Sequence, residues 1–139
     1  SGYAVLPLSR PHDDDAIRSA EVAIESNFSR TLRVEDLARE RHMSARNFVR
    51  RFKAATGRTP GDYLQATRMA VAKQLLESGA RSVQTVCEAV GYEDAAFFRA
   101  LFKRHTGMSP AEYRENFGAT AAAERGHSRQ GAPRPAARS

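Results

Sequence analysis

The sequence of 139 residues predicts an all-α fold of seven helices, built as two similar units joined by a central linker helix. Apolar residues return every three or four positions almost throughout, which is typical of amphipathic helices, and the alternating β-branched runs typical of strands are absent. The segment FVRRFKAATGRTP at 48–60 also returns as FRALFKRHTGMSP at 98–110. A chain of this length has room for one modest domain, or for two very small ones that share a core.

The first three helices are predicted between the aspartates at 13–15 and Gly57. The aspartates offer an N-cap and favourable first-turn charge to a first helix, whose inward face carries Ile17, Ala20, Ile24 and Phe28. A short second helix is expected from about Val34 to Arg41. The third begins after a cap at Ser44 and runs to about Thr56, where Gly57 supplies a left-handed stop.

The fourth helix is predicted from Pro60 to Ser78 and is the central linker. Thr59 is its cap, proline occupies its first helical position, and Gly79 ends it. Because it is apolar on more than one side, we expect it to lie between two modules.

The last three helices are marked by the same signals, a capping residue before the helix or a glycine after it. Ser82 caps a fifth helix, and a sixth runs from about Asp94 to Thr106 before Gly107. The segment SPAE at 109–112 is a capping box for a seventh helix at 110–117.

The two ends of the chain lack core-forming residues. Residues 1–12 carry two prolines and are expected to be a linker, and residues 119–139 are built of small, polar and basic residues and are expected to be disordered. The ordered domain is predicted over 13–118. Its parts are a first unit at about 34–57, the linker helix at 60–78, a second unit at about 82–107 and the final helix at 110–117.

The charge of the chain indicates an anionic partner. Lysine and arginine number 22 against 16 aspartate and glutamate residues, and the isoelectric point is about 10.1. Residues 41–61 and 95–111 hold basic residues and no acid, so the positive charge gathers on the repeated segment. A mildly basic, solvated surface is the plain alternative.

The sequence also indicates where the protein works. No apolar run reaches about 18 residues and no leader opens the chain, so we expect neither a membrane span nor secretion. The single cysteine, Cys87, fits a reducing cytoplasm.

Each copy of the repeat is a short helix, a tight turn and a longer basic helix, which is the pattern of a helix-turn-helix unit. In such units the second helix lies in the DNA major groove. Phe48 and Phe52 are one turn apart, which predicts a buried face and leaves Arg46, Asn47, Arg50 and Lys53 on the other side. Arginine pairs with guanine and asparagine with adenine. Two such helices in one chain would reach two successive major-groove segments, roughly 34 Å apart.

Other functions find less support in the residues. Cys87 replaces a small buried alanine of the first copy, which favours packing over a redox or alkyl-accepting role. The four histidines are scattered without metal-ligand spacing, no phosphate loop occurs, and no catalytic triad is positioned. We therefore expect a non-enzyme without a metal or cofactor. The alternative function is an all-helical adaptor that binds an acidic protein or RNA.

Two motifs carry a resemblance to a known family. LARERHMSARNFVRRFKAATGRTPGDYL at 37–64 and VCEAVGYEDAAFFRALFKRHTGMSPAEYR at 86–114 resemble the C-terminal DNA-binding domain of AraC/XylS-family bacterial transcription regulators. The lead-in RPHDDDAI at 10–17 resembles a subgroup with an N-terminal glutamine-amidotransferase-like (PfpI-like) domain. The resemblance implies a cytoplasmic activator that binds double-stranded DNA, touches RNA polymerase and carries a sensor domain that is missing here. Because the sequence shows no apolar stripe that could form a dimer interface, the fragment is expected to be monomeric.

The resemblance also implies which residues meet the DNA. Base contacts are implied for Arg46, Val49 and Arg50 in the third helix and for Ala96, Phe97 and Ala100 in the sixth, and the helical spacing adds Asn47 and Arg99. Phosphate contacts are expected from the side chains of Arg41, Arg51, Lys53, Lys103 and Arg104 and from helix N-termini at Ser44, Thr59, Ser82 and Ser109. Because alanines dominate the exposed positions of the sixth helix, the third is expected to carry most of the specificity.

Two positions depart from the family pattern. His42 stands in the first turn where relatives often have glycine, and histidine is among the non-glycine residues that accept a positive φ. Arg33 stands where a serine cap is common. The first turn is therefore expected to form with some strain.

Overall fold

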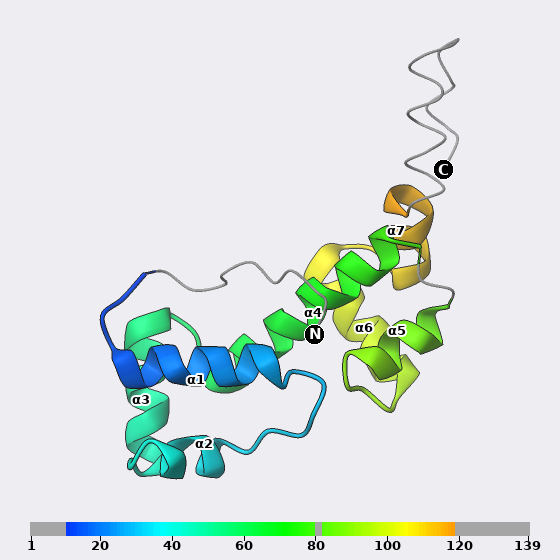
Figure 1. The fold of residues 1–139 in the computed structure, drawn as a ribbon. Helices are drawn as coiled ribbons and strands as arrows, with labels where there is room; N and C mark the ends of the chain where they lie inside the picture. The colour runs from blue at the N-terminus through cyan, green and yellow to red at the C-terminus, as the bar shows by residue number, and fades with distance from the viewer. Residues whose placement is uncertain (1–10, 80–81, 119–139) are drawn as a thin grey trace. The chain divides into compact units, whose positions relative to one another are not determined.

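The computed structural model describes residues 11–79 and 82–118, which form seven α-helices and no strand (Figure 1). The helices are α1 (Asp15–Ser26), α2 (Val34–Glu40), α3 (Ala45–Thr56), α4 (Pro60–Glu77), α5 (Val83–Ala89), α6 (Ala95–Thr106) and α7 (Pro110–Phe117). The all-α prediction is confirmed. The expected linker at 1–12 lies mostly outside the described residues, and the tail at 119–139 lies outside them entirely.

The helix ends follow the predicted signals. Asp14 caps α1, serine side chains cap α3, α5 and α7, and Asp94 accepts from two backbone N–H groups of α6. Gly57 and Gly107 end α3 and α6 with a φ of 83° each. The capping box of α7 is complete, and the backbone N–H of Ser109 lowers the pKa of Glu112. Arg33 makes no side-chain cap for α2.

Two predicted helix ends were placed too far along the chain. Phe28 was expected on a face of the first helix, yet α1 ends at Ser26 and Phe28 is buried in the turn that follows. The fourth helix was expected to reach Ser78 and ends at Glu77. The buried positions themselves were predicted correctly, because an apolar side chain next to a helix end packs into the same core as the helix.

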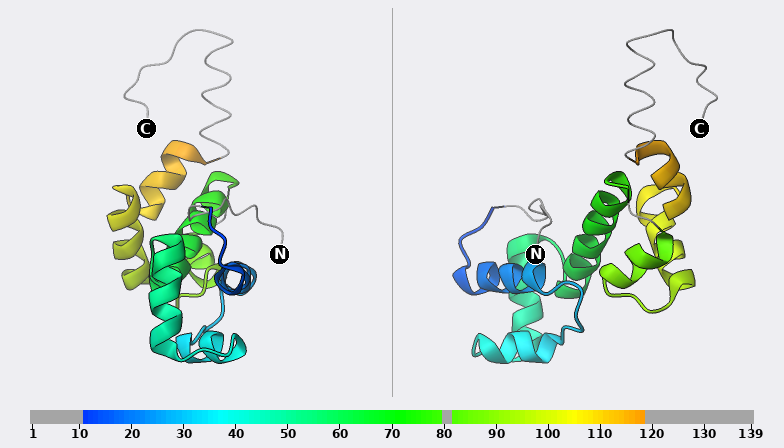
Figure 2. Two further views of the ribbon diagram at one scale, coloured as in Figure 1. Left: turned by 90° about the vertical axis from the view of Figure 1, so that its left-hand side faces the viewer. Right: turned by 45° about the vertical axis from the view of Figure 1, so that its right-hand side comes forward.

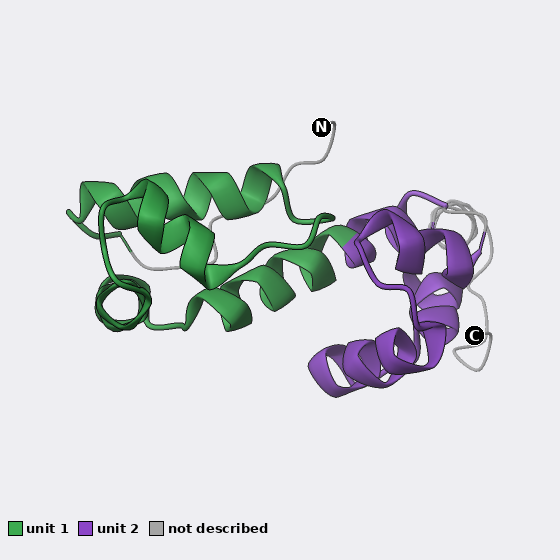
Figure 3. Ribbon diagram, turned by 90° about the horizontal axis from the view of Figure 1, so that it is seen from below, with its two compact units in different colours: residues 1–71 green, residues 72–139 purple. Residues whose placement is uncertain are grey.

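The chain divides into two compact units between Val71 and Ala72, inside α4 (Figure 3). Helix α4 therefore begins in unit 1 and ends in unit 2, as expected of a linker helix. Within unit 1, α3 crosses both α1 and α2, which the two views of Figure 2 show from different sides.

Unit 1 is built around aromatic side chains from α3 and α4. Phe48 and Phe52 are fully buried, with ring centroids 5.7 Å apart, and Tyr63 of α4 meets the Phe52 ring edge-on at 5.6 Å. Ile17, Ala20 and Ile24 of α1 and Leu37 and Ala38 of α2 complete this core. These contacts fix the rotation of α3 about its own axis.

Unit 2 repeats the same aromatic arrangement. The Phe98 and Phe102 ring centroids are 5.9 Å apart, and Tyr113 of α7 meets Phe102 edge-on at 5.4 Å. Val86 and Cys87 of α5 are fully buried, in the places that Leu37 and Ala38 hold in unit 1. The repeated sequence therefore builds the same core twice.

The structural repeat is longer than the helix-turn-helix segment. The Tyr63 hydroxyl donates to Glu25 at the end of α1, and the Tyr113 hydroxyl donates to Glu77 at the end of α4. In both tyrosines burial and the neighbouring carboxylate raise the pKa of the phenol. Helix α1 therefore does in unit 1 what the end of α4 does in unit 2. The sequence signal for this equivalence is the Glu-Ser pair that ends both segments, at 25–26 and 77–78.

Candidate nucleic-acid interface

Helix α3 presents a cationic face opposite its buried one. Because Phe48 and Phe52 are fully buried, Arg46, Arg50 and Lys53 are exposed on the other side. Among the residues that the structure describes, the side chains of Arg46 and Lys53 make no hydrogen bond or ion pair. Two cations of this helix are thus left with all their donors for an external acceptor.

Two polar side chains on this face are joined to each other. Arg50 donates from Nη2 to Oδ1 of Asn47, one turn earlier on α3. Asn47 is half-buried, and its backbone N–H donates to the Ser44 cap at 3.1 Å. Val49 is also half-buried. The side chains predicted to meet bases from α3 therefore lie on one side of one helix, and two of them are coupled.

The corresponding face of α6 is largely apolar. Ala96, Phe97 and Ala100 are exposed, together with Arg99. The Phe97 side chain is 50% exposed, and its ring centroid lies 5.8 Å from that of Tyr92 in the turn. Lys103 and Arg104 are exposed in the last turn of α6. The two units therefore offer different chemistry, hydrogen-bond donors on α3 and methyl and aromatic groups on α6.

The predicted phosphate sites at helix N-termini are all helix caps in the structure. Ser44, Ser82 and Ser109 accept from backbone N–H groups of their own helices, at 3.0–3.1 Å. The Thr59 hydroxyl accepts from the backbone N–H of Asp62 at 3.1 Å. Each cap oxygen already has a donor, so an anion at these positions would meet the remaining backbone N–H groups of the first turn.

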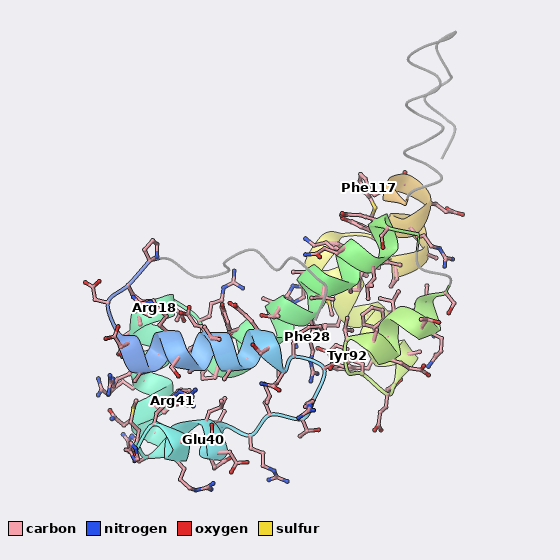
Figure 4. The ribbon with its side chains drawn as sticks, viewed as in Figure 1. Arg18, Phe28, Glu40, Arg41, Tyr92 and Phe117 are labelled. Atoms are coloured by element: carbon pink, nitrogen blue, oxygen red, sulfur yellow. The ribbon has the colours of Figure 1, made fainter. Side chains whose placement is uncertain are left out.

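Arg41 is turned inward, toward α1. It donates to the Leu37 carbonyl at 2.9 Å and to the Ser19 hydroxyl at 3.0 Å, and its side chain is only 11% exposed (Figure 4). Its Nε is buried without a partner. The predicted phosphate role of Arg41 would require these contacts to be given up, and its present position ties α2 to α1.

Arg51 is held by an acidic residue of the α1 cap. Its Nε and Nη2 donate to the two carboxylate oxygens of Asp14, at 3.1 and 2.7 Å. This pairing is the main cause of the lowered pKa of Asp14. Asp14 also accepts from the backbone N–H of Ile17, so one side chain both caps α1 and fastens it to α3. The predicted phosphate contact of Arg51 competes with this ion pair.

Asp14→Ala is expected to lower the free energy of unfolding by about 1 kcal/mol or somewhat more, because it removes a helix cap together with an ion pair. Asp14→Asn keeps an oxygen for the cap and loses the charge, so its expected cost is smaller. The folded protein holds the pKa of Asp14 below the ordinary 3.8, so the ion pair stabilises the fold above that pH and is lost as the pH falls through the lowered value. Urea unfolding of the wild type and Asp14→Asn at pH 7 and at about pH 3 measures this; a stability difference that grows on acidification would contradict it.

The turn of unit 1 forms around a histidine, as expected. His42 has a φ of 61° and Gly91, in the turn of unit 2, has a φ of 100°. In both turns the residue that follows donates its backbone N–H back into the short helix, Met43 to Ala38 at 2.9 Å and Tyr92 to Cys87 at 3.0 Å. The two turns therefore close with the same hydrogen bond although only one contains glycine.

Cys87 lies in the core of unit 2. Its side chain is fully buried, and the thiol donates to the Tyr92 carbonyl at 3.2 Å. Burial raises the pKa of the thiol, which disfavours the reactive thiolate.

We expect Cys87 in the folded protein to react with a thiol reagent at least about a hundredfold more slowly than in urea, because reaction requires unit 2 to open. Labelling followed by mass spectrometry, with and without denaturant, checks this. Equal rates in both conditions would revive a role for Cys87 in redox or alkyl-transfer chemistry.

The described part of the chain holds neither a cluster of metal ligands nor a helix that could span a membrane. No group of three or more histidine, cysteine, aspartate or glutamate residues there is arranged to hold a metal ion. None of the described helices is long and apolar enough to cross a membrane.

Two helix-turn-helix units, each with its own core and an outward second helix, place the chain in the class of double helix-turn-helix proteins. The family model described as "Helix-turn-helix domain" matches residues 37–116. The chain belongs to the AraC family of helix-turn-helix DNA-binding domains.

Two proteins of similar sequence or structure are named as regulators. The MmsAB operon regulatory protein of Pseudomonas aeruginosa is 37% identical over 112 residues, a match that covers 79% of this chain and 36% of that protein. The crystal structure of the DNA-binding domain of AdpA, a global transcriptional factor, in complex with a target DNA has a TM-score of 0.69 and 33% identity, and the match covers 85% of this chain and 100% of that one. This chain thus spans well under half the length of the first of these relatives.

One relative combines regulation with an enzymatic activity. The bifunctional transcriptional activator/DNA repair enzyme AdaA of Bacillus subtilis is 35% identical over 92 residues, which cover 66% of this chain and 44% of that protein. The similarity thus reaches less than half of AdaA.

Proposed function

We propose that this chain binds double-stranded DNA in a sequence-dependent manner, as the C-terminal domain of a bacterial transcription regulator. The observation that carries the proposal is the outward face of α3, where exposed cations without intramolecular partners stand on a helix whose rotation is fixed by Phe48 and Phe52. The recurrence of the same core around α6 supports a second reading helix, and we propose that the two enter successive major-groove segments.

The roles of the two helices differ in this proposal. Arg46 and Arg50 have the donors that guanine accepts in the major groove, and Val49 lies beside them for apolar contact. Ala96, Phe97 and Ala100 of α6 suit thymine methyl groups, with Arg99 alongside. We therefore propose that unit 1 reads bases by hydrogen bonds and unit 2 reads them mainly by apolar contact and shape.

The basic side chains proposed to contact phosphates are those that are exposed and unpaired. The side chains of Lys53, Lys103 and Arg104 are exposed and make no hydrogen bond or ion pair with a described residue, so we propose them as the principal phosphate ligands. The helix N-termini after Ser44, Thr59, Ser82 and Ser109 would add backbone N–H groups. Arg41 and Arg51 rank last, because their guanidinium groups are already engaged.

The wider assignments rest on the family alone. This chain covers 36% of the length of the MmsAB operon regulatory protein, which supports a place within a longer protein. We propose that the N-terminal part of that protein is a sensor domain, of the PfpI-like type that the lead-in at 10–17 resembles. We propose that the domain is a non-enzymatic, monomeric activator module that works in the cytoplasm and also meets RNA polymerase.

Selection from a randomised duplex pool tests the proposal, followed by binding of the selected and a scrambled duplex across a salt series. We expect a site with two boxes about one helical turn apart and affinity well above that for the scrambled duplex. Equal and steeply salt-dependent binding to every duplex would contradict it. Preference for single-stranded RNA, or for an acidic protein, would favour the adaptor alternative.

A further inference from the structure

The contact between Asn47 and Arg50 assigns these two residues different tasks. We propose that Asn47 is a positioning residue, which holds the Arg50 guanidinium ready for one guanine, and that Arg50 makes the base contact. The inference rests on the proposed function and deepens it, because it names the base and the residue that reads it.

The hydrogen bond itself shows which atom of Asn47 faces its neighbour. A guanidinium has donors and no acceptor, so the group that meets Arg50 Nη2 is the amide oxygen of Asn47. Arg50 retains donors on Nε, Nη1 and Nη2, which are enough for the O6 and N7 acceptors of guanine. The contact therefore uses one donor of Arg50 and leaves its capacity for a bidentate pair intact.

The position of Asn47 on α3 suits a supporting role. Its side chain is half-buried, whereas that of Arg50 is exposed. Its backbone is fixed in the first turn by the bond to the Ser44 cap, at 3.1 Å. A short side chain on a rigid part of the helix can thus hold the end of a long one.

Holding Arg50 in the free protein matters because arginine loses much rotamer freedom when it is ordered. A side chain that is already ordered pays less of this entropy when it meets the base, so affinity for the matching base rises. Arg46, one turn earlier on α3, has no such partner among the described residues. The two arginines are therefore unequal, and Arg50 is the one prepared to discriminate.

The same pair is absent from the second unit. The positions that correspond to Asn47 and Arg50 are Phe97 and Ala100 of α6, both exposed. Guanine selection of this kind is thus confined to the box that α3 reads.

A double-mutant cycle on the full chain tests the inference. Wild type, Asn47→Ala, Arg50→Ala and the double variant are measured on the site selected by the wild type, and on duplexes in which each G·C pair of the site is replaced in turn by A·T. We expect Arg50→Ala to abolish discrimination at one G·C pair and Asn47→Ala to reduce it there about fivefold. In the Arg50→Ala background, Asn47→Ala should have no further effect, because Asn47 acts through Arg50.

Asn47→Asp is the conservative variant. It retains an oxygen that accepts from Arg50, so we expect it to keep the discrimination ratio at that pair while it weakens binding to all duplexes through repulsion from phosphates. The thermal midpoint of Asn47→Ala should match that of the wild type, because the only hydrogen bond of this side chain within the described structure is the one to Arg50.

The outcomes separate this inference from the function on which it rests. An effect of Asn47→Ala at a different base pair, or one that persists in the Arg50→Ala background, would show that Asn47 reads a base itself and would overturn the inference alone. Unchanged discrimination in Asn47→Ala would do the same. A wild type that selects no site would overturn the proposed function and the inference together.

Discussion

Phe52→Ala is expected to lower the free energy of unfolding of unit 1 by about 3–5 kcal/mol, as large-to-small substitutions of buried aromatic residues do. The Phe52 ring is fully buried and lies between Phe48 and Tyr63, with centroids 5.7 and 5.6 Å away. Its loss removes the contacts that join α3 to α4. Because small domains have only about 5–15 kcal/mol of stability in all, unit 1 should be close to unfolding at room temperature.

Urea unfolding followed by circular dichroism measures the effect, and the chain offers two matched controls. Lys53→Ala changes the exposed next residue and should alter stability by less than about 0.5 kcal/mol. Phe102→Ala removes the corresponding ring of unit 2, which meets Tyr113 at 5.4 Å, and should cost a similar amount. A Phe52→Ala variant as stable as Lys53→Ala would mean that the aromatic cluster does not hold α3 in place.

Arg46→Ala combined with Arg50→Ala is expected to remove most of the sequence preference while the fold stays intact. Each good arginine–guanine pair is worth about 1–3 kcal/mol of discrimination, so the ratio of affinities for the selected and scrambled duplexes should fall toward one. Both side chains are exposed, and neither forms an ion pair in the described structure, so stability should change little. Competition binding with selected and scrambled duplexes, together with a thermal melt, checks both statements.

Arg99→Ala is the matched control on α6. Arg99 is exposed among alanines, and its loss should weaken binding to all duplexes alike, with a decrease of about 0.9 in the salt slope if it contacts one phosphate. The opposite pattern, in which preference survives the double substitution on α3 and disappears with Arg99→Ala, would transfer the specificity to unit 2.

Intramolecular pairing divides the basic residues of this chain into two groups. Arg41, Arg51 and Arg68 donate to Ser19 of α1, to Asp14 at its N-cap and to the Phe28 carbonyl in the turn after it. Arg46, Lys53 and Arg104 have no partner among the described residues. Net charge therefore overstates the charge available to DNA, because part of it holds α1 against the rest of unit 1.

The exposed aromatic residues also divide by position. Phe97 stands on the outward face of α6, where a base-reading role is proposed. Phe117 is 43% exposed on the last turn of α7, where its ring meets that of Tyr113 at 4.8 Å (Figure 4). Exposure alone does not distinguish the roles of these two phenylalanines. The helix that carries each one does.

The helices could be predicted from the sequence, because the signals that start and end them are local. A cap such as Ser44, a capping box at Ser109 and a left-handed glycine at 57 or 107 act within one turn of the chain, so they can be recognised without knowledge of the fold. The repeat then made the two cores predictable, since the same aromatic spacing must bury the same face twice. Even the positive φ of His42 in the first turn was predicted, because histidine tolerates that conformation.

The long-range pairing of the arginine side chains, by contrast, depends on how the helices pack. Arg51 and Asp14 are 37 residues apart, and Arg41 and Ser19 are 22 apart, so no local pattern links them. The equivalence of α1 with the end of α4 has only a two-residue signal in the sequence, and it is the hydrogen bonds from Tyr63 to Glu25 and from Tyr113 to Glu77 that establish it. A long, flexible side chain takes whichever partner the packed helices bring within reach, and that choice is made by contacts distant in the chain.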